Sequence, residues 1–192
     1  MYLIQRTTFL IFTLPILAFS QAKVDTVSFD QVAISIGDMA PNFSGEDETG
    51  RIINLSNLKG KKNFVLIFFR GYWWPHCRRQ LAELSKIKLP EDTELWAVSV
   101  ESSEASAEFK KRNTEKGYPI SFPLLWDKDY KIIDAFGLTD PRYKGHKYEG
   151  IPYATTHIID KTGKIWFSHI ALTYTIRPSN EKILSILSSL NN

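Results

Sequence analysis

Some segments of the chain have continuous apolar runs typical of strands, and others have apolar residues at helical spacing. The alternation of these two kinds of segment predicts strands interleaved with helices. Residues 63–70 (NFVLIFFR) form a continuous apolar run between glycine-containing segments, which is typical of a strand covered on both faces. Cys77, Leu81 and Leu84 then recur at helical spacing, so an amphipathic helix is expected to begin just after Pro75. A buried strand followed directly by an amphipathic helix indicates an α/β protein.

The rest of the chain continues this pattern. The expected elements are a helix over 77–88, a strand over 94–100, a polar helix over 102–116, a short helix over 130–136, strands over 154–160 and 164–170, and a last helix capped by Ser179. Residues 161–163 (KTG) between the last two strands predict a β-hairpin. The order predicts an α/β fold with a central mixed sheet and helices on both faces.

The first twenty residues have the features of a secretory signal peptide. Arg6 precedes an apolar run over 9–18, and Ala18 and Ser20 are small residues suited to cleavage after Ser20. The run is shorter than the ~20 apolar residues that span a bilayer. We therefore expect residues 1–20 to be removed, with no other membrane contact, and a periplasmic or secreted product. The alternative is an uncleaved anchor or a disordered tail.

Length and composition predict one folded domain. After the signal segment we expect a lead-in over 21–35 and a domain over 36–192. A hydrophobic fraction of 43% supplies a core and excludes a disordered chain. The 24 basic and 21 acidic residues are interspersed, so a net charge of +3 does not indicate nucleic-acid binding. Because there is one cysteine, no intrachain disulfide forms.

Residues 70–81 (RGYWWPHCRRQL) carry the strongest candidate chemistry. They join the end of the central strand to the start of a helix, where open α/β sheets place ligands and catalytic groups. Cys77 is expected in the first helical turn, where unpaired N–H groups and the helix dipole stabilise a thiolate. Arg70, Arg78 or Arg79 would add to this effect if its side chain turned towards the sulfur. Alternatively, Cys77 is a small apolar residue of the buried stripe.

This segment resembles the peroxiredoxin-like branch of the alkyl hydroperoxide reductase and thiol-specific antioxidant (AhpC/TSA) family. The signature of that branch runs Arg-Gly-x-Trp-Cys-Pro-x-Cys-x-x-Gln-Leu, and this chain has Trp74 at the first cysteine and Cys77 at the second. Further stretches agree in order and spacing with the family, at 36–43, 52–60, 134–138, 158–165 and 173–178. The resemblance implies a thioredoxin-like fold over nearly the whole mature chain.

The resemblance also implies an activity. The Cys77 thiolate would reduce a hydroperoxide and become a sulfenic acid. An external thiol reductant, or another protein's thiol or disulfide, is then needed because the chain has no second cysteine. Family members carry a cis-proline or an arginine near the hairpin, where this chain has Ala154. Arg177 is therefore the candidate partner of the thiolate, its alternative being a solvated side chain. No metal, flavin or nucleotide cofactor is implied.

The residues expected to line a substrate pocket flank Cys77 in sequence or in the family alignment: Tyr72, Trp73, Trp74, Pro75, His76, Ala154 and Thr155. The three aromatic residues form either a packed lid or an apolar surface for a partner or an organic hydroperoxide. His76 is a candidate base, although adjacent helical residues point in different directions. The histidines at 76, 157 and 169 and Cys77 are soft metal ligands whose spacing indicates no site.

Two other functions fit the same residues. Without the first cysteine and the cis-proline, the fold can persist as a redox-inactive binding module. A lone thiol can also form mixed disulfides with another exported protein, or a homodimer through Cys77, so monomer and homodimer both stay open. The setting of the sulfur separates these functions. A solvent-open sulfur with a cation within ~4 Å favours redox chemistry, and a sulfur buried beneath Trp74 favours the inert module.

Overall fold

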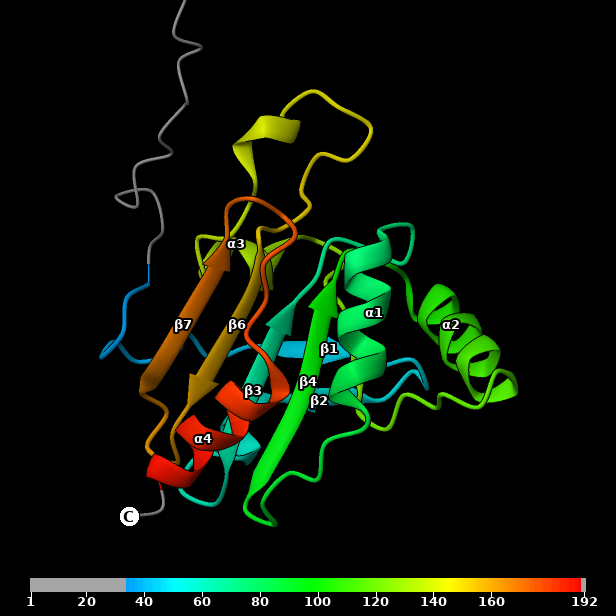
Figure 1. Cartoon of the computed structure of the whole chain (residues 1–192). Coiled ribbons are helices and arrows are strands. Elements are labelled where there is room, and N and C mark those ends of the chain that lie inside the picture. Colours follow the sequence, from blue (N-terminus) through cyan, green and yellow to red (C-terminus); the bar gives the residue numbers. More distant parts are fainter. Residues whose placement is uncertain (1–33, 191–192) are drawn as a thin grey trace, which may run out of the picture.

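The computed structural model describes residues 34–190, which form a sheet with helices on both faces (Figure 1). The strands are β1 (Ser44–Glu46), β2 (Ile52–Asn54), β3 (Asn63–Phe68), β4 (Thr93–Ser99), β5 (Leu124–Trp126), β6 (Ala154–Ile159) and β7 (Ile165–Ala171). The helices are α1 (Pro75–Leu84), α2 (Ser103–Glu115), α3 (Lys131–Ala135) and α4 (Asn180–Leu190), with short 3-10 helices η2 (Leu55–Asn57) and η3 (Pro141–Tyr143). The predicted signal peptide and nearly all of the predicted lead-in lie outside the described residues.

The sheet is mixed, as the order of elements predicts. Its strands run β2-β1-β5-β4-β3-β6-β7, with β3 parallel to β4 and antiparallel to β6. Strands β6 and β7 form the expected antiparallel hairpin, whose turn is held by the Asp160 carboxylate accepting from the Thr162 and Lys164 backbone N–H groups. The predicted α/β fold with a central mixed sheet is confirmed.

Strand β3 is buried on both faces because helices cover each side of it. Val65 and Ile67 belong to a core with α1, α2 and α4, whereas Phe64, Leu66 and Phe68 belong to a second core with α3. All five side chains are at most 1% exposed. This double covering explains the uninterrupted apolar run.

Within residues 34–190, no helix combines the length and apolar character needed to cross a membrane.

Two features differ from the pattern-based prediction. Helix α1 ends at Leu84 rather than at residue 88, because Ile87 and Leu89, two residues apart, both pack against the same core. That spacing suits an extended chain and not a helix. Strands β1 and β5 were not predicted, since three residues each are too few to show a period. Strand β2 lies in the stretch at 52–60 that resembles the family's strand and turn before the central strand.

Candidate functional site

The junction between β3 and α1 places Cys77 at the start of a helix. Gly71 has φ of 149° and lies against Glu101 and Trp73, where a Cβ atom would clash with both side chains. Trp74 is the N-cap of α1 and Pro75 its first residue, so Cys77 falls in the first turn as predicted. Its side chain points into the core and has no exposed surface.

Arg177 provides the cation nearest to the sulfur among the contacts of the described residues. Its Nη2 atom lies 4.0 Å from Cys77 Sγ. Its Nε donates to Gln80 Oε1 at 2.9 Å, and its Nη1 donates to the Ile176 carbonyl at 2.8 Å. Burial lowers the pKa of the Arg177 guanidinium, and the nearby Cys77 sulfur acts in the opposite direction. The structure therefore brings Arg177 beside Cys77, the residue for which it was the candidate partner.

The other candidate partners of the sulfur are engaged elsewhere. Arg78 Nη1 donates to the Tyr72 carbonyl at 3.1 Å, and Arg79 Nη2 lies 3.0 Å from His76 Nδ1. The Cys77 backbone N–H donates to the Trp74 carbonyl at 3.1 Å. The expectation that unpaired N–H groups surround the sulfur is thus wrong for the cysteine's own N–H, because the first helical turn closes on its N-cap.

Arg70 is buried in an aromatic cage and does not turn towards the sulfur as a partner. Its Cζ lies 3.9 Å from the Tyr174 ring centroid, 4.7 Å from that of Tyr143 and 5.2 Å from that of Trp74. Its Nη1 lies 3.9 Å from Asp140 Oδ2, and none of its three buried nitrogens has a hydrogen bond of good geometry. The cage joins the loop before α1 to the segment that carries Arg177.

The three predicted pocket aromatics point to different neighbours. Tyr72 stacks on Phe109 of α2 at 4.2 Å, and its hydroxyl donates to Ser106. Trp73 stacks on Tyr148 at 4.3 Å. Trp74 packs against the core that contains Cys77 and faces the Arg70 cage. Tyr72 is a buried member of that same core, so Tyr72 and Trp74 both lie on the cysteine side of the sheet, and of these two Trp74 is the half-buried one.

The remaining predicted pocket residues lie at the two ends of the same region. Pro75 is exposed, while His76 is half-buried, with its ring 5.8 Å from that of Trp74. Ala154 and Thr155 begin β6 and are buried, with the Thr155 hydroxyl donating to the Tyr153 carbonyl at 3.0 Å. No cis peptide bond occurs within residues 34–190.

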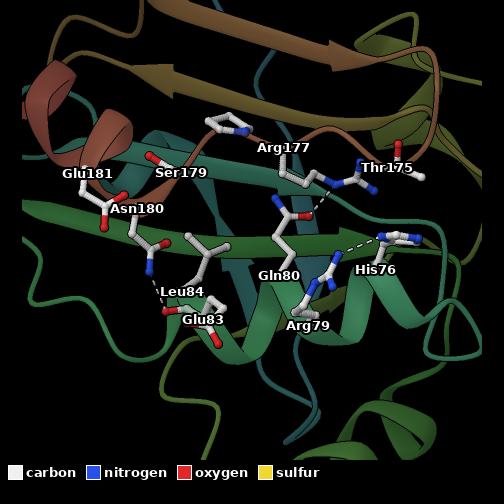
Figure 2. A pocket seen from close by; sticks show the side chains of 11 residues that line it. His76, Arg79, Gln80, Glu83, Leu84, Thr175, Arg177, Ser179, Asn180 and Glu181 are labelled. Carbon is white, nitrogen blue, oxygen red and sulfur yellow. Dashed lines mark hydrogen bonds between the residues drawn. The ribbon is translucent and has the colours of Figure 1, made fainter.

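A groove of about 370 Å³ opens beside α1, along the segment that leads into α4 (Figure 2). The polar and charged side chains that line it include His76, Arg79, Gln80, Glu83, Arg177 and Glu181. Arg177 belongs both to this groove and to the contact with the sulfur. Sequence reasoning assigned no role to Gln80, although it is the Gln of the signature and sits one turn after Cys77.

The structure does not gather the potential metal ligands. Within residues 34–190, no group of three or more His, Cys, Asp or Glu side chains is arranged to hold a metal ion. His157 lies in the core, with its ring 5.6 Å from that of Phe136 and 6.1 Å from that of Phe68. Burial lowers the pKa of His157 to about 4, so the ring is neutral at pH 7.

A mixed sheet that presents one cysteine at the start of the helix after its central strand defines a thioredoxin-like protein. Comparison with known proteins makes the assignment more specific. Residues 36–168 match the model of the AhpC/TSA family, and the chain belongs to this family of thioredoxin-fold redox enzymes.

Individual relatives agree with this assignment. The chain is 32% identical to the thiol-disulfide oxidoreductase ResA of Bacillus subtilis over 136 residues, 69% of this chain and 66% of that protein. It is 31% identical to the thioredoxin-like protein YneN of Bacillus subtilis, over 82% of this chain and 84% of that protein. The reduced 2-Cys peroxiredoxin of Plasmodium vivax has the same fold, with a TM-score of 0.69 and 22% identity over 82% of this chain and 97% of that chain.

Proposed function

We propose that this protein reduces hydroperoxides through Cys77 alone, with an external thiol as reductant. The observation that supports it is the Arg177 guanidinium, whose Nη2 lies 4.0 Å from Cys77 Sγ. A cation at this distance in a buried site stabilises the thiolate, which is the nucleophilic form of cysteine. The hydrogen bond from Arg177 to Gln80 holds the guanidinium in place.

The proposed reaction has two stages. The Cys77 thiolate attacks the distal oxygen of the hydroperoxide, an S–O bond forms and the O–O bond breaks, and the alkoxide takes up a proton to become an alcohol. Cys77 is thereby oxidised to a sulfenic acid. One external thiol condenses with it to give a mixed disulfide and water, and a second thiol restores Cys77 and leaves as the disulfide. Arg177 stabilises the negative charge on the sulfur and on the leaving oxygen.

The reaction requires movement at the site because the sulfur has no exposed surface. Two half-buried side chains are relevant to access: Arg177, whose Nη2 lies 4.0 Å from Sγ, and Trp74, which packs against the core that contains Cys77. The Trp74 ring makes a cation–π contact with Arg70 in the aromatic cage, whereas Arg177 borders an open groove. We propose that oxidants reach Cys77 from the Arg177 side.

A redox-inactive binding module is the second candidate, and one observation favours it. The sulfur is wholly buried in the core with which Trp74 packs, and Trp74 stands where the family branch has its first cysteine. In that case Cys77 is a packing residue of α1, and Arg177 lies near it as a structural neighbour.

Trapping of the sulfenic acid separates the two candidates. The purified protein is treated with substoichiometric hydrogen peroxide in the presence of dimedone, and the adduct at Cys77 is quantified by mass spectrometry. Rapid labelling that disappears in Cys77→Ser supports the peroxidase. In Arg177→Met, we expect labelling to slow by roughly 10- to 100-fold, corresponding to about 1.4–2.7 kcal/mol. The exposed cation at Lys182 provides the control, since Lys182→Met removes the same charge nearby and should leave labelling unchanged.

We also propose that the protein works outside the cytoplasm, as the pattern of residues 1–20 predicts. Expression of the full chain in a bacterium, followed by cell fractionation and N-terminal sequencing, tests this proposal. A periplasmic product that begins at Gln21 supports it, and a cytoplasmic product that keeps Met1 contradicts it.

A further inference from the structure

The groove beside α1 carries opposite charges at its two ends (Figure 2). Arg79 and Arg177 lie towards one end, and Glu83 and Glu181 lie towards the other. The basic end is the one that adjoins Cys77, because Arg177 lies 4.0 Å from its sulfur. A complementary ligand therefore has a negative group close to the sulfur and a positive group farther away.

The size of the groove restricts the ligand further. A volume of about 370 Å³ lies near the lower end of the ~300–1,000 Å³ that is usual for small-molecule sites. We propose that this groove binds the reductant of the reaction above, and that the reductant is a small peptide thiol with a carboxylate and a free amino group. This inference rests on the proposed function and specifies the class of its second substrate.

Two of the four charged residues are the more available for such a ligand. Glu83 already pairs with Lys86 at 2.7 Å, and Arg177 is hydrogen-bonded to Gln80. Arg79 is exposed, and the hydrogen bond found for its side chain is with a histidine ring. Hydrogen bonds within the first turn of α4 lower the pKa of Glu181, which is therefore charged at neutral pH. Arg79 is assigned to the carboxylate and Glu181 to the amino group.

The chemical step takes place at the basic end. The peptide thiolate attacks Sγ of the Cys77 sulfenic acid, an S–S bond forms, and the S–O bond breaks with release of hydroxide, which takes up a proton to give water. Cys77 is reduced by a second peptide thiol, and the peptide leaves as its disulfide. Binding of the carboxylate and amino groups raises the local concentration of the thiol beside the sulfur.

Probe thiols with different charges test this assignment. The protein is oxidised with one equivalent of hydrogen peroxide and mixed with glutathione, N-acetylcysteine or cysteamine. Glutathione has both kinds of charge, N-acetylcysteine only the carboxylate, and cysteamine only the amino group. The rate of mixed-disulfide formation at Cys77 is followed by rapid quenching and intact-mass spectrometry. Comparing wild type with a variant for each thiol cancels differences in intrinsic nucleophilicity.

Each substitution should act on its own group. At low ionic strength, Arg79→Gln should lower the rate of mixed-disulfide formation with glutathione and with N-acetylcysteine by roughly 3- to 10-fold. The rate with cysteamine should stay unchanged. Glu181→Gln should lower the rate with glutathione and with cysteamine and leave the rate with N-acetylcysteine unchanged. Arg78→Gln is the matched control, since it removes the same charge from the preceding residue of α1, which does not line the groove. If Arg78→Gln lowers the rate with glutathione as much as Arg79→Gln does, a long-range electrostatic effect explains the change and the inference is overturned.

A measurement without redox chemistry keeps this inference separate from the proposed function. S-methylglutathione has no free thiol, and its binding to the reduced protein is measured by calorimetry. Binding that Arg79→Gln weakens and Arg78→Gln does not supports the groove. Absence of binding overturns the inference even where Cys77 forms a sulfenic acid. Binding to a protein whose Cys77 resists peroxide supports the groove and contradicts the proposed function.

Discussion

Gln80 and Arg177 are 97 residues apart in the chain and are joined by a hydrogen bond of 2.9 Å. This bond links α1, which carries Cys77, to the segment between β7 and α4, which carries the cation. Gln80 is itself buried, and its amide nitrogen lies 3.5 Å from the Thr156 hydroxyl of β6. A neutral side chain thus holds the guanidinium while leaving its charge for the sulfur.

Gln80→Glu is expected to make Cys77 less reactive without unfolding the protein. The new carboxylate keeps the shape of the glutamine but pairs with Arg177, and so competes with the thiolate for the same charge. Sulfenic-acid trapping should slow by roughly tenfold, which corresponds to about 1.4 kcal/mol. Gln80→Met, which removes the hydrogen bond without adding charge, should have a smaller effect. A larger effect of the methionine variant would show that positioning, and not competition for charge, is the role of Gln80.

Trp74→Cys is expected to create a disulfide reductase. The variant has two cysteines separated by Pro75 and His76 at the start of α1, and the backbone there already forms a first helical turn. Such a pair supports thiol–disulfide exchange. Reduction of insulin by dithiothreitol measures the gain. Trp73→Cys is the control, because it places the added thiol one residue away from that spacing. Equal activity in both variants would contradict the expectation.

Asp140→Asn is expected to destabilise the fold by about 3–5 kcal/mol, as when one partner of a buried ion pair is removed. The buried carboxylate accepts from Arg142 at 2.7 and 2.9 Å and lies 3.9 Å from Arg70. Its loss leaves the buried Arg70 charge without a counter-ion. Urea unfolding measures the change, with the exposed pair of Asp129 as control, where Asp129→Asn should cost less than about 1 kcal/mol.

Adding Arg70→Met to that variant tests the explanation. The double variant should recover part of the lost stability, because an apolar side chain of similar length needs no counter-ion in the aromatic cage. If the double variant instead loses the sum of the unfolding free energies lost by Asp140→Asn and Arg70→Met alone, the ring contacts of Arg70 matter more than its charge.

Stability should fall as the pH drops from 6.5 towards 4, because of His157. Its pKa is about 4 in the folded protein against 6.5 for the free side chain. Between these values the unfolded chain takes up a proton that the native protein does not, so the free energy of unfolding decreases. The full loss is roughly 3 kcal/mol, and above pH 6.5 the residue adds no pH dependence. His157→Leu should flatten this part of a urea-denaturation pH profile, and an unchanged slope would contradict the assignment.

Most of the fold could be predicted from local patterns, because long elements repeat their burial period many times. The run at residues 63–70, the stripe from Cys77 to Leu84 and the hairpin turn each correspond to an element of the structure. The three-residue strands β1 and β5 could not be predicted in the same way, since β1 and β5 pair with each other and their sequences are 78 or more residues apart. Asp140 and its loop were missed for the same reason.

The resemblance to the AhpC/TSA family implied that the fold is thioredoxin-like. What the residue pattern by itself determined is an α/β protein with a mixed sheet and a lone cysteine in the first turn of the helix that follows a buried strand. Apolar periodicity and a proline at the helix start are local properties, and they are sufficient for that statement. Only the tertiary structure decided which cation reaches the sulfur and that Arg70 is enclosed by rings. It also decided that a groove of mixed charge borders the site. Those contacts join residues as much as 100 positions apart, and side-chain packing in three dimensions, not local spacing, selects among them.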